Sequence, residues 1–256
     1  TAFYAERGYL ARVILPPQEL ATGVVEFQVV EGRRGAVTVD RQGQRIDAAK
    51  VQAYVDRRLP ANAPMDIAAL GEALAIVNEQ PGADVAASLL AGAEEGAVDL
   101  RLTARDRAPR AISLGLNNQS SRGVGEAQAF ASVAWNNPTG RFDAATLLFS
   151  GTEGSQYLRA DYGLPVGDAG TRVRVHVGTL AYKLVQASFS ALEAEGTAHT
   201  LGLSGSHPLR RRAGHSLTLS GGVELKRLTD DTAAGESGRR HLSVATLGVA
   251  GERAVA

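Results

Sequence analysis

Residues 216–226, with the sequence SLTLSGGVELK, decide the fold of the second part of this 256-residue chain. Apolar residues or glycine occupy every second position, and polar residues or glycine lie between them. Successive side chains of a β-strand point to opposite faces of the sheet, so a period of two predicts a strand with one apolar face and one polar face. The apolar face holds Leu217, Leu219, Gly221, Val223 and Leu225, and the polar face holds Ser216, Thr218, Ser220, Gly222, Glu224 and Lys226.

This alternation recurs along the chain after about residue 109, in runs of about 8 to 11 residues, the length of a tilted strand that crosses a bilayer. The pattern predicts about eight antiparallel strands. Two of them, 142–150 and 242–250, have apolar residues on both faces, which leaves their register open. The runs are 112–117, 127–136, 142–150, 156–164, 171–178, 197–206, 216–226 and 242–250.

The connections between these strands favour a barrel, although alternation alone also permits a soluble sandwich. Turn-rich, proline-bearing connections at 137–140, 165–170 and 206–214 alternate with longer polar connections. Short turns on one rim and longer loops on the other are typical of an outer-membrane barrel. The longer connections are 119–126, 186–196 and 229–240.

The first 105 residues mix helical and strand patterns. Apolar residues at helical spacing predict helices over 47–59 and 66–80, with Asp47 as an N-cap and Pro81-Gly82 as a stop. Strand-like runs flank them, which gives the order β-α-α-β-β and a small α+β unit. These runs are 36–40, 84–90 and 97–103. A helix-like segment at 4–7 and strands at 13–15 and 24–30 read as the end of a second copy of the unit.

Composition excludes several classes of function. The chain has no cysteine, which excludes a disulfide scaffold and a thiolate site, and its 27 basic and 27 acidic residues argue against nucleic-acid binding. The stretch 202–206 lacks the closing glycine of a hydrolase nucleophile elbow, and the five histidines are scattered singly. We therefore expect no catalytic, cofactor-binding or metal-binding residues, no cofactor and no enzyme activity.

Short sequences in a fixed order resemble one family, the two-partner secretion outer-membrane transporters (TpsB family, the hemolysin secretion/activation proteins of ShlB/FhaC/HecB type). Those near the N-terminus resemble the end of that family's first POTRA domain, and Asn78, Pro81-Gly82 and Leu100 resemble its second. Later ones resemble its barrel turns. The N-terminal sequences are Glu6-Arg7-Gly8-Tyr9, Leu15-Pro16-Pro17-Gln18 and Val29-Val30-Glu31-Gly32, and the later ones include Asn136-Asn137-Pro138-Thr139-Gly140, Pro165-Val166-Gly167 and Ser206-His207-Pro208-Leu209.

The resemblance implies a 16-stranded outer-membrane β-barrel preceded by two periplasmic POTRA domains. Residues 1–33 would end the first POTRA domain, 34–108 would form the second, and 109–256 would form the N-terminal half of the transmembrane β-barrel, about 8 of 16 strands. The chain would then be an internal fragment that lacks the family's plug helix and its inward Arg-Gly-Tyr loop. Arg7-Gly8-Tyr9 is not that loop, because it precedes the POTRA strands.

The implied partners are a secreted exoprotein of TpsA type with an N-terminal secretion domain, outer-membrane lipid, periplasmic chaperones and the barrel-assembly machinery. The resemblance places strand 84–90 at an open sheet edge, where an extended polypeptide could add as a strand. The candidate binding residues there are Val85, Ala86, Ala87, Ser88 and Leu89.

Charged residues opposite the apolar faces of the strands would line a hydrated lumen in a barrel. They are Arg159, Asp161, Arg172, Arg174, His176, Glu224 and Lys226. The run Arg210-Arg211-Arg212 could bind anionic lipid head groups or a partner, but a solvated turn at the periplasmic rim is the favoured interpretation.

Three other functions remain open: a barrel-assembly insertase, which carries more POTRA units, a passive porin, which needs no α+β units, and an outer-membrane hydrolase, which the failed elbow disfavours.

Overall fold

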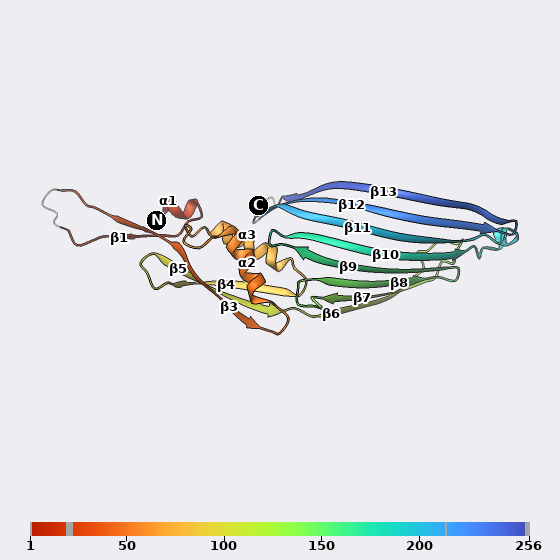
Figure 1. Ribbon diagram of the computed structural model, residues 1–256, viewed down its shortest axis with the longest axis horizontal. Helices are drawn as coiled ribbons and strands as arrows, with labels where there is room; N and C mark the ends of the chain where they lie inside the picture. The colour runs from red at the N-terminus through yellow and green to blue at the C-terminus, as the bar shows by residue number, and fades with distance from the viewer. Residues whose placement is uncertain (1, 19–22, 213, 254–256) are drawn as a thin grey trace.

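A computed structural model describes residues 2–18, 23–212 and 214–253. Three parts follow one another along its long axis (Figure 1): a two-stranded sheet, an α+β unit, and an eight-stranded sheet. Among the described residues, no helix combines the length and the apolar character needed to cross a membrane.

The N-terminal part is small. Helix α1 (Ala2–Glu6) precedes β1 (Ala11–Ile14), which pairs in antiparallel fashion with β2 (Gln28–Glu31). The predicted strand 24–30 starts too early, because Ile14 at the end of β1 pairs with Gln28 and no strand faces residues 24–27.

The α+β unit comprises residues 33–106. Its helices are α2 (Ala48–Arg58) and α3 (Ile67–Asn78), close to the predicted ranges. The side chains of Asp47 and Asp66 accept hydrogen bonds from the first free N–H groups of α2 and α3, which fixes where each helix begins. The sheet has the order β3–β5–β4, with β5 parallel to β3 and antiparallel to β4. Its strands are β3 (Arg33–Gln42), β4 (Ala83–Ala91) and β5 (Ala97–Asp106).

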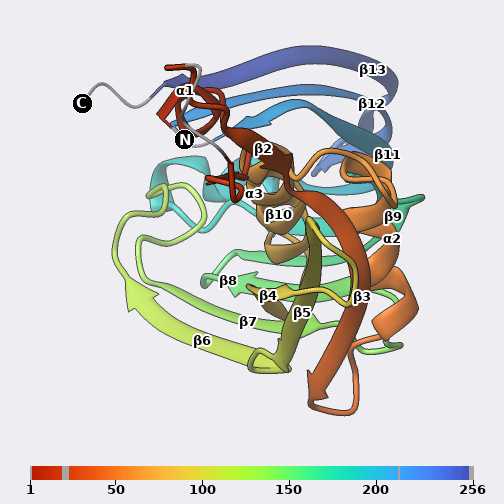
Figure 2. The same ribbon diagram turned by 90° about the vertical axis from the view of Figure 1, so that its left-hand side faces the viewer.

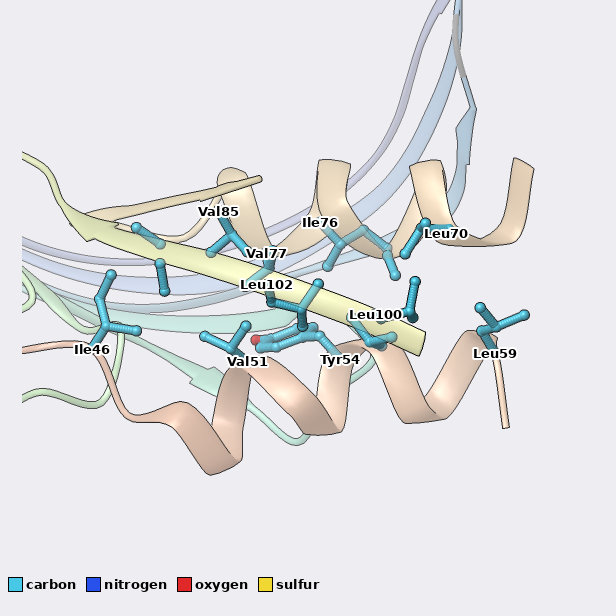
Figure 3. Packing of buried hydrophobic residues seen from close by; sticks show 14 of the residues in the cluster. Ile46, Val51, Tyr54, Leu59, Leu70, Ile76, Val77, Val85, Leu100 and Leu102 are labelled. Atoms are coloured by element: carbon cyan, nitrogen blue, oxygen red, sulfur yellow. The ribbon is translucent and has the colours of Figure 1, made fainter. Parts of the chain in front are cut away.

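Both helices cover one face of this sheet (Figure 3). Tyr54 of α2 and Ile76 of α3 pack against Leu102 of β5, and all three side chains are buried. Burial of each such side chain stabilises the unit by about 1.5 to 3 kcal/mol. The same core includes Phe142, which lies between two strands of the eight-stranded sheet and outside the unit.

Each strand of the eight-stranded sheet is antiparallel to the next, and the sheet curves into an open arc around the end of the α+β unit (Figure 2). An α+β unit followed by an antiparallel sheet of eight strands confirms the predicted fold class. A short 3-10 helix, η2 (Ala187–Leu192), lies in the predicted long loop between β10 and β11. The strands are β6 (Arg110–Asn117), β7 (Gln128–Asn136), β8 (Ala144–Gly151), β9 (Ser155–Val166), β10 (Thr171–Lys183), β11 (Glu195–Arg212), β12 (His215–Thr232) and β13 (Gly235–Arg253).

Two predicted connections are wrong. The loop expected at 229–240 is a tight hairpin, because β12 continues to Thr232 and β13 starts at Gly235. The turn expected at 206–214 is also mostly strand, since β11 continues to Arg212. Ladder hydrogen bonds join backbone groups, so a strand can continue past its apolar section into polar sequence that resembles a loop.

The structure also gives the pairing of the two predicted strands, 142–150 and 242–250, whose register the sequence left open. Phe142 is not the first residue of a strand, because β8 begins at Ala144, which pairs with Asn136. In β13, Leu242 pairs with Lys226.

Candidate functional site

Strand β4 forms one edge of the three-stranded sheet, and all five candidate binding residues lie in it. The side-chain amide of Asn78 covers part of that edge. Its Oδ1 accepts from Val85 N at 2.6 Å, and its Nδ2 donates to Val85 O at 2.9 Å. The backbone of Val85 therefore points outward but is already paired.

Residues of an antiparallel strand alternate between pairing with the neighbour and pointing away from it. Since Val85 points outward, Ala87 and Leu89 do too, while Ala86 and Ser88 pair with Thr103 and Arg101 of β5. The outward backbone groups at Ala87 and Leu89 are the part of the edge beyond the reach of Asn78. Nothing in the sequence distinguishes these two sets.

The side chains of the candidate residues differ in access. Val85 is buried, Ala87 packs against the core, and Leu89 is 41% exposed. Ala86 and Ser88 are exposed on the opposite face of the sheet. Beyond the end of β4 lies a cavity of about 670 Å³, whose lining includes Leu89, Leu90 and Ala91 together with Leu10 and Val98.

A second candidate site is the polar face of the eight-stranded sheet. Arg159 donates two hydrogen bonds of 2.9 Å to Asp161. His176 Nε2 lies 2.9 Å from Glu224 Oε2, and Lys226 Nζ lies 2.7 Å from Glu224 Oε1. Strands β10 and β12 are separated by β11, so these side chains reach toward each other across it, as the concave face of a curved sheet allows.

Two glycines of β11 make these contacts possible. The imidazole of His176 crosses Gly202 to reach Glu224, and the Tyr182 ring crosses Gly196 to donate to Asp230 at 2.8 Å. A Cβ at Gly196 would lie 2.7 Å from the Tyr182 ring. Both glycines thus permit the close approach of a side chain, which is one reason for a glycine inside a strand.

The α+β unit docks on the turn between β7 and β8, residues 137–143. Phe142 is 0% exposed, and its ring meets that of Tyr54 edge-on at 6.3 Å between centroids. Its φ of +60° is unfavourable for a bulky residue, and burial in the unit's core offsets that cost. Asn137 Oδ1 accepts from Phe142 N at 2.6 Å, and Asn137 Nδ2 donates to Arg45 O at 3.0 Å.

The same turn holds a buried carboxylate. Asp143 accepts from Tyr162 Oη at 2.8 Å and from Thr139 N at 3.2 Å. Burial acts to raise the pKa of Asp143, but these hydrogen bonds to the charged form outweigh it and lower the pKa below its usual value.

Polar contacts also fix the unit to the turn between β9 and β10, to the start of β10 and to the end of β11. Arg172 Nη1 donates to Gln80 Oε1 at 2.7 Å, and Arg57 pairs with Asp168 at 3.1 Å. Arg211 Nε pairs with Glu79 at 2.6 Å, and its side chain is 16% exposed. The solvated role expected for Arg210-Arg211-Arg212 is therefore wrong for Arg211, while Arg210 and Arg212 are exposed.

The seven charged residues proposed for the lumen lie on one face by strand register. Arg159, Asp161, His176, Glu224 and Lys226 form the ion-pair clusters described above. Arg172 turns toward the α+β unit, and Arg174 is exposed. The sequence predicted the common face, because it follows from period two. It did not predict the partners, because they depend on how the sheet curves.

Residues 96–255 match the family described as haemolysin secretion/activation protein ShlB/FhaC/HecB, and residues 1–32 match the ShlB-type POTRA domain. The heme/hemopexin transporter protein HuxB of Haemophilus influenzae (strain 86-028NP) is 27% identical over 257 residues, covering 97% of this chain and 44% of HuxB. The outer membrane transporter CdiB of Dickeya dadantii (strain 3937) is 24% identical over 172 residues, covering 64% of this chain and 30% of CdiB.

Among solved structures, CdiB from Escherichia coli superposes with a TM-score of 0.77 at 21% identity, over 99% of this chain and 48% of that one. The chain thus spans less than half the length of the relatives it matches. The family match covers more than half of the chain and confirms the family that the short sequences resembled. The chain belongs to the haemolysin secretion/activation family ShlB/FhaC/HecB, the outer-membrane transporters of two-partner secretion, whose POTRA domains lie in the periplasm.

Proposed function

We propose that this chain is part of a transporter that captures a secreted exoprotein of TpsA type at the β4 edge and exports it through the barrel. In this proposal residues 1–33 end a first POTRA domain, 34–108 form the second, and 109–256 form half of the barrel. Transport through this part of the chain needs no catalytic residue. Lipid surrounds the apolar face of the sheet, and periplasmic chaperones and the barrel-assembly machinery deliver the chain to the membrane.

The observation that carries the proposal is the open part of the β4 edge. The outward N–H and C=O groups of Ala87 and Leu89 can pair with an extended chain, as in β-augmentation. Backbone hydrogen bonds depend little on the sequence of the bound strand, which suits capture of a polypeptide that is still unfolded in transit. The α+β unit lies across the open end of the curved sheet, so a chain held at this edge is close to the concave face (Figure 2).

The charges on the concave face support export of a polypeptide over ion conduction. Arg159, Asp161, His176, Glu224 and Lys226 combine both signs in paired clusters. A selective ion pore carries rings of one sign, whereas a mixed surface tolerates the varied side chains of a passing chain.

Proline substitution at Ala87 in the full-length protein tests the proposal. Ala87→Pro removes one outward N–H and leaves the β4–β5 ladder intact. Ala87→Val adds similar bulk and keeps the N–H, so it is the matched control. We expect Ala87→Pro to weaken binding of the cargo's N-terminal secretion domain while Ala87→Val binds as the parent does.

The fold must be intact for the comparison to count. Heat-modifiable gel mobility and resistance of the α+β unit to protease should be the same in both variants. If a folded Ala87→Pro variant binds the domain as tightly as the parent, the β4 edge is not the docking site.

A further inference from the structure

Three consecutive residues at the C-terminal end of helix α3 each contact a different strand. Asn78 binds the β4 edge at Val85, Glu79 pairs with Arg211 of β11, and Gln80 accepts from Arg172 of β10. We propose that this connector, residues 78–80, transmits occupation of the β4 edge to the concave wall of the barrel at Arg172. The inference rests on the proposed docking of cargo at that edge.

The first step is a competition for the backbone of Val85. A strand that pairs with the outward groups of Leu89 and Ala87 meets Val85 as the next outward residue. The amide of Asn78 already satisfies the N–H and the C=O of Val85. A cargo strand that extends to this position must displace Asn78, whose amide occupies the place of a neighbouring strand.

The second step is movement of Gln80. Its side chain is 2% exposed and held at both ends, because Nε2 donates to Ile76 O at 2.9 Å and Oε1 accepts from Arg172 at 2.7 Å. Its backbone oxygen also accepts from Ala83 N at the start of β4. Displacement of Asn78, two residues earlier, therefore strains the contacts of this closely packed side chain.

The third step takes place on the concave face. Arg172 also donates to Phe142 O at 3.3 Å and borders a cavity of about 210 Å³ that is lined in part by Asp161 and Arg174. If Gln80 moves, Arg172 loses its shortest hydrogen bond and can turn into this cavity toward Asp161. Capture in the periplasm would thereby change the charge that lines the base of the barrel.

A single cysteine can report this change in the full-length protein in lipid vesicles once any cysteine outside these 256 residues is replaced by serine, since the 256 residues contain none. Ser204 lines a cavity of about 290 Å³ together with Arg172 and Arg174, so Ser204→Cys senses this region. The measurement is the rate of maleimide labelling with and without the cargo's N-terminal secretion domain. We expect the domain to change the rate of the otherwise parental protein by about two- to thirty-fold, the range for coupling of 0.5 to 2 kcal/mol.

Gln80→Leu removes the acceptor for Arg172 and should bind the domain but show no change in labelling. Arg172→Met breaks the same contact from the barrel side and gives a second test if Gln80→Leu fails to fold. Arg57→Met is the control, because it breaks a different polar contact between the α+β unit and the sheet, the pairing with Asp168, and leaves the partners of the connector in place. It should keep the response.

Two results would contradict the proposed role of the connector without contradicting docking at the β4 edge. In the first, the domain binds but the labelling rate of the parental protein does not change. In the second, both connector variants respond as the parent does. Failure of the proposed docking appears separately, as unchanged binding of the domain by folded Ala87→Pro. If the domain does not bind the parental protein, both proposals are wrong.

Discussion

The α+β unit and the eight-stranded sheet place their apolar side chains in opposite ways. In the unit, Val51 and Leu100 are fully buried between helices and sheet, whereas in β6 Leu114 and Leu116 are 77% and 84% exposed. In the proposed transporter, water surrounds the first arrangement and lipid the second, so exposed leucine there marks a membrane face and not a missing partner. Phe142 is the exception, because it lies between two strands of the sheet in the sequence while its side chain is buried in the core of the unit.

The largest loss of stability is expected from a substitution at Phe142. Phe142→Ala leaves a cavity in the core of the unit and should destabilise it by about 3 to 5 kcal/mol. Denaturant-dependent proteolysis of the unit in the full-length protein measures this cost. Phe149→Ala is the control, because Phe149 lies on the same hairpin but is 42% exposed. An equal, small effect of both substitutions would mean that the unit does not need the turn.

Arginine substitutions on the two faces of one strand compare the lipid-facing side of the sheet with its lumen-facing side. Leu203 and Ser204 are neighbours near the middle of β11, on the convex and concave faces respectively. Leu203→Arg should cost about 2 to 4 kcal/mol near the bilayer midplane, and Ser204→Arg much less, because water hydrates the concave face. Heat-modifiable mobility after graded urea treatment compares the two. Equal loss of the folded form would show that the faces are assigned wrongly.

A methyl group at Gly196 tests whether the Tyr182 ring needs the open space over this glycine to reach Asp230. Gly196→Ala places a Cβ 2.7 Å from both the Tyr182 ring and the backbone oxygen of Thr229 and should destabilise the sheet by about 1 to 3 kcal/mol through overpacking. At Gly205 of the same strand the nearest atom to an added Cβ is 3.6 Å away, so Gly205→Ala should be tolerated. The same urea assay applies, and the idea fails if the two variants unfold at the same concentration.

The smallest effect is expected for the dependence of the unit's stability on pH. The pKa of Asp143 is lower in the folded protein than in the unfolded chain, where it is about 3.9. Its contribution is therefore present above that pH and is lost as the pH falls toward the folded pKa. Between about pH 4 and pH 2, protease resistance of the α+β unit should fall more steeply in the parent than in Asp143→Asn. Parallel curves for the two proteins would contradict the role of this carboxylate.

Sequence patterns predicted the elements that obey one period. Alternation identified the faces of β10 and β12, and helical spacing with Asp47 identified α2, because each signal is local. Phe142 was assigned to a strand, since its burial depends on a domain that docks from elsewhere in the chain. The pairing of Asn78 with Val85 was not predicted, because it depends on how the end of α3 packs against the edge of β4, and neither the helical period nor the strand period shows that packing. Strand ends were misjudged where β12 and β13 continue through polar residues.

Hydrogen exchange at single residues tests the docking of cargo at the β4 edge most directly. The full-length protein is compared with and without the cargo's N-terminal secretion domain. We expect the outward amides of Ala87 and Leu89 to become protected, and those of Ala86 and Ser88, already paired with β5, to stay unchanged. Binding of the domain with no added protection at Ala87 and Leu89 would contradict the account.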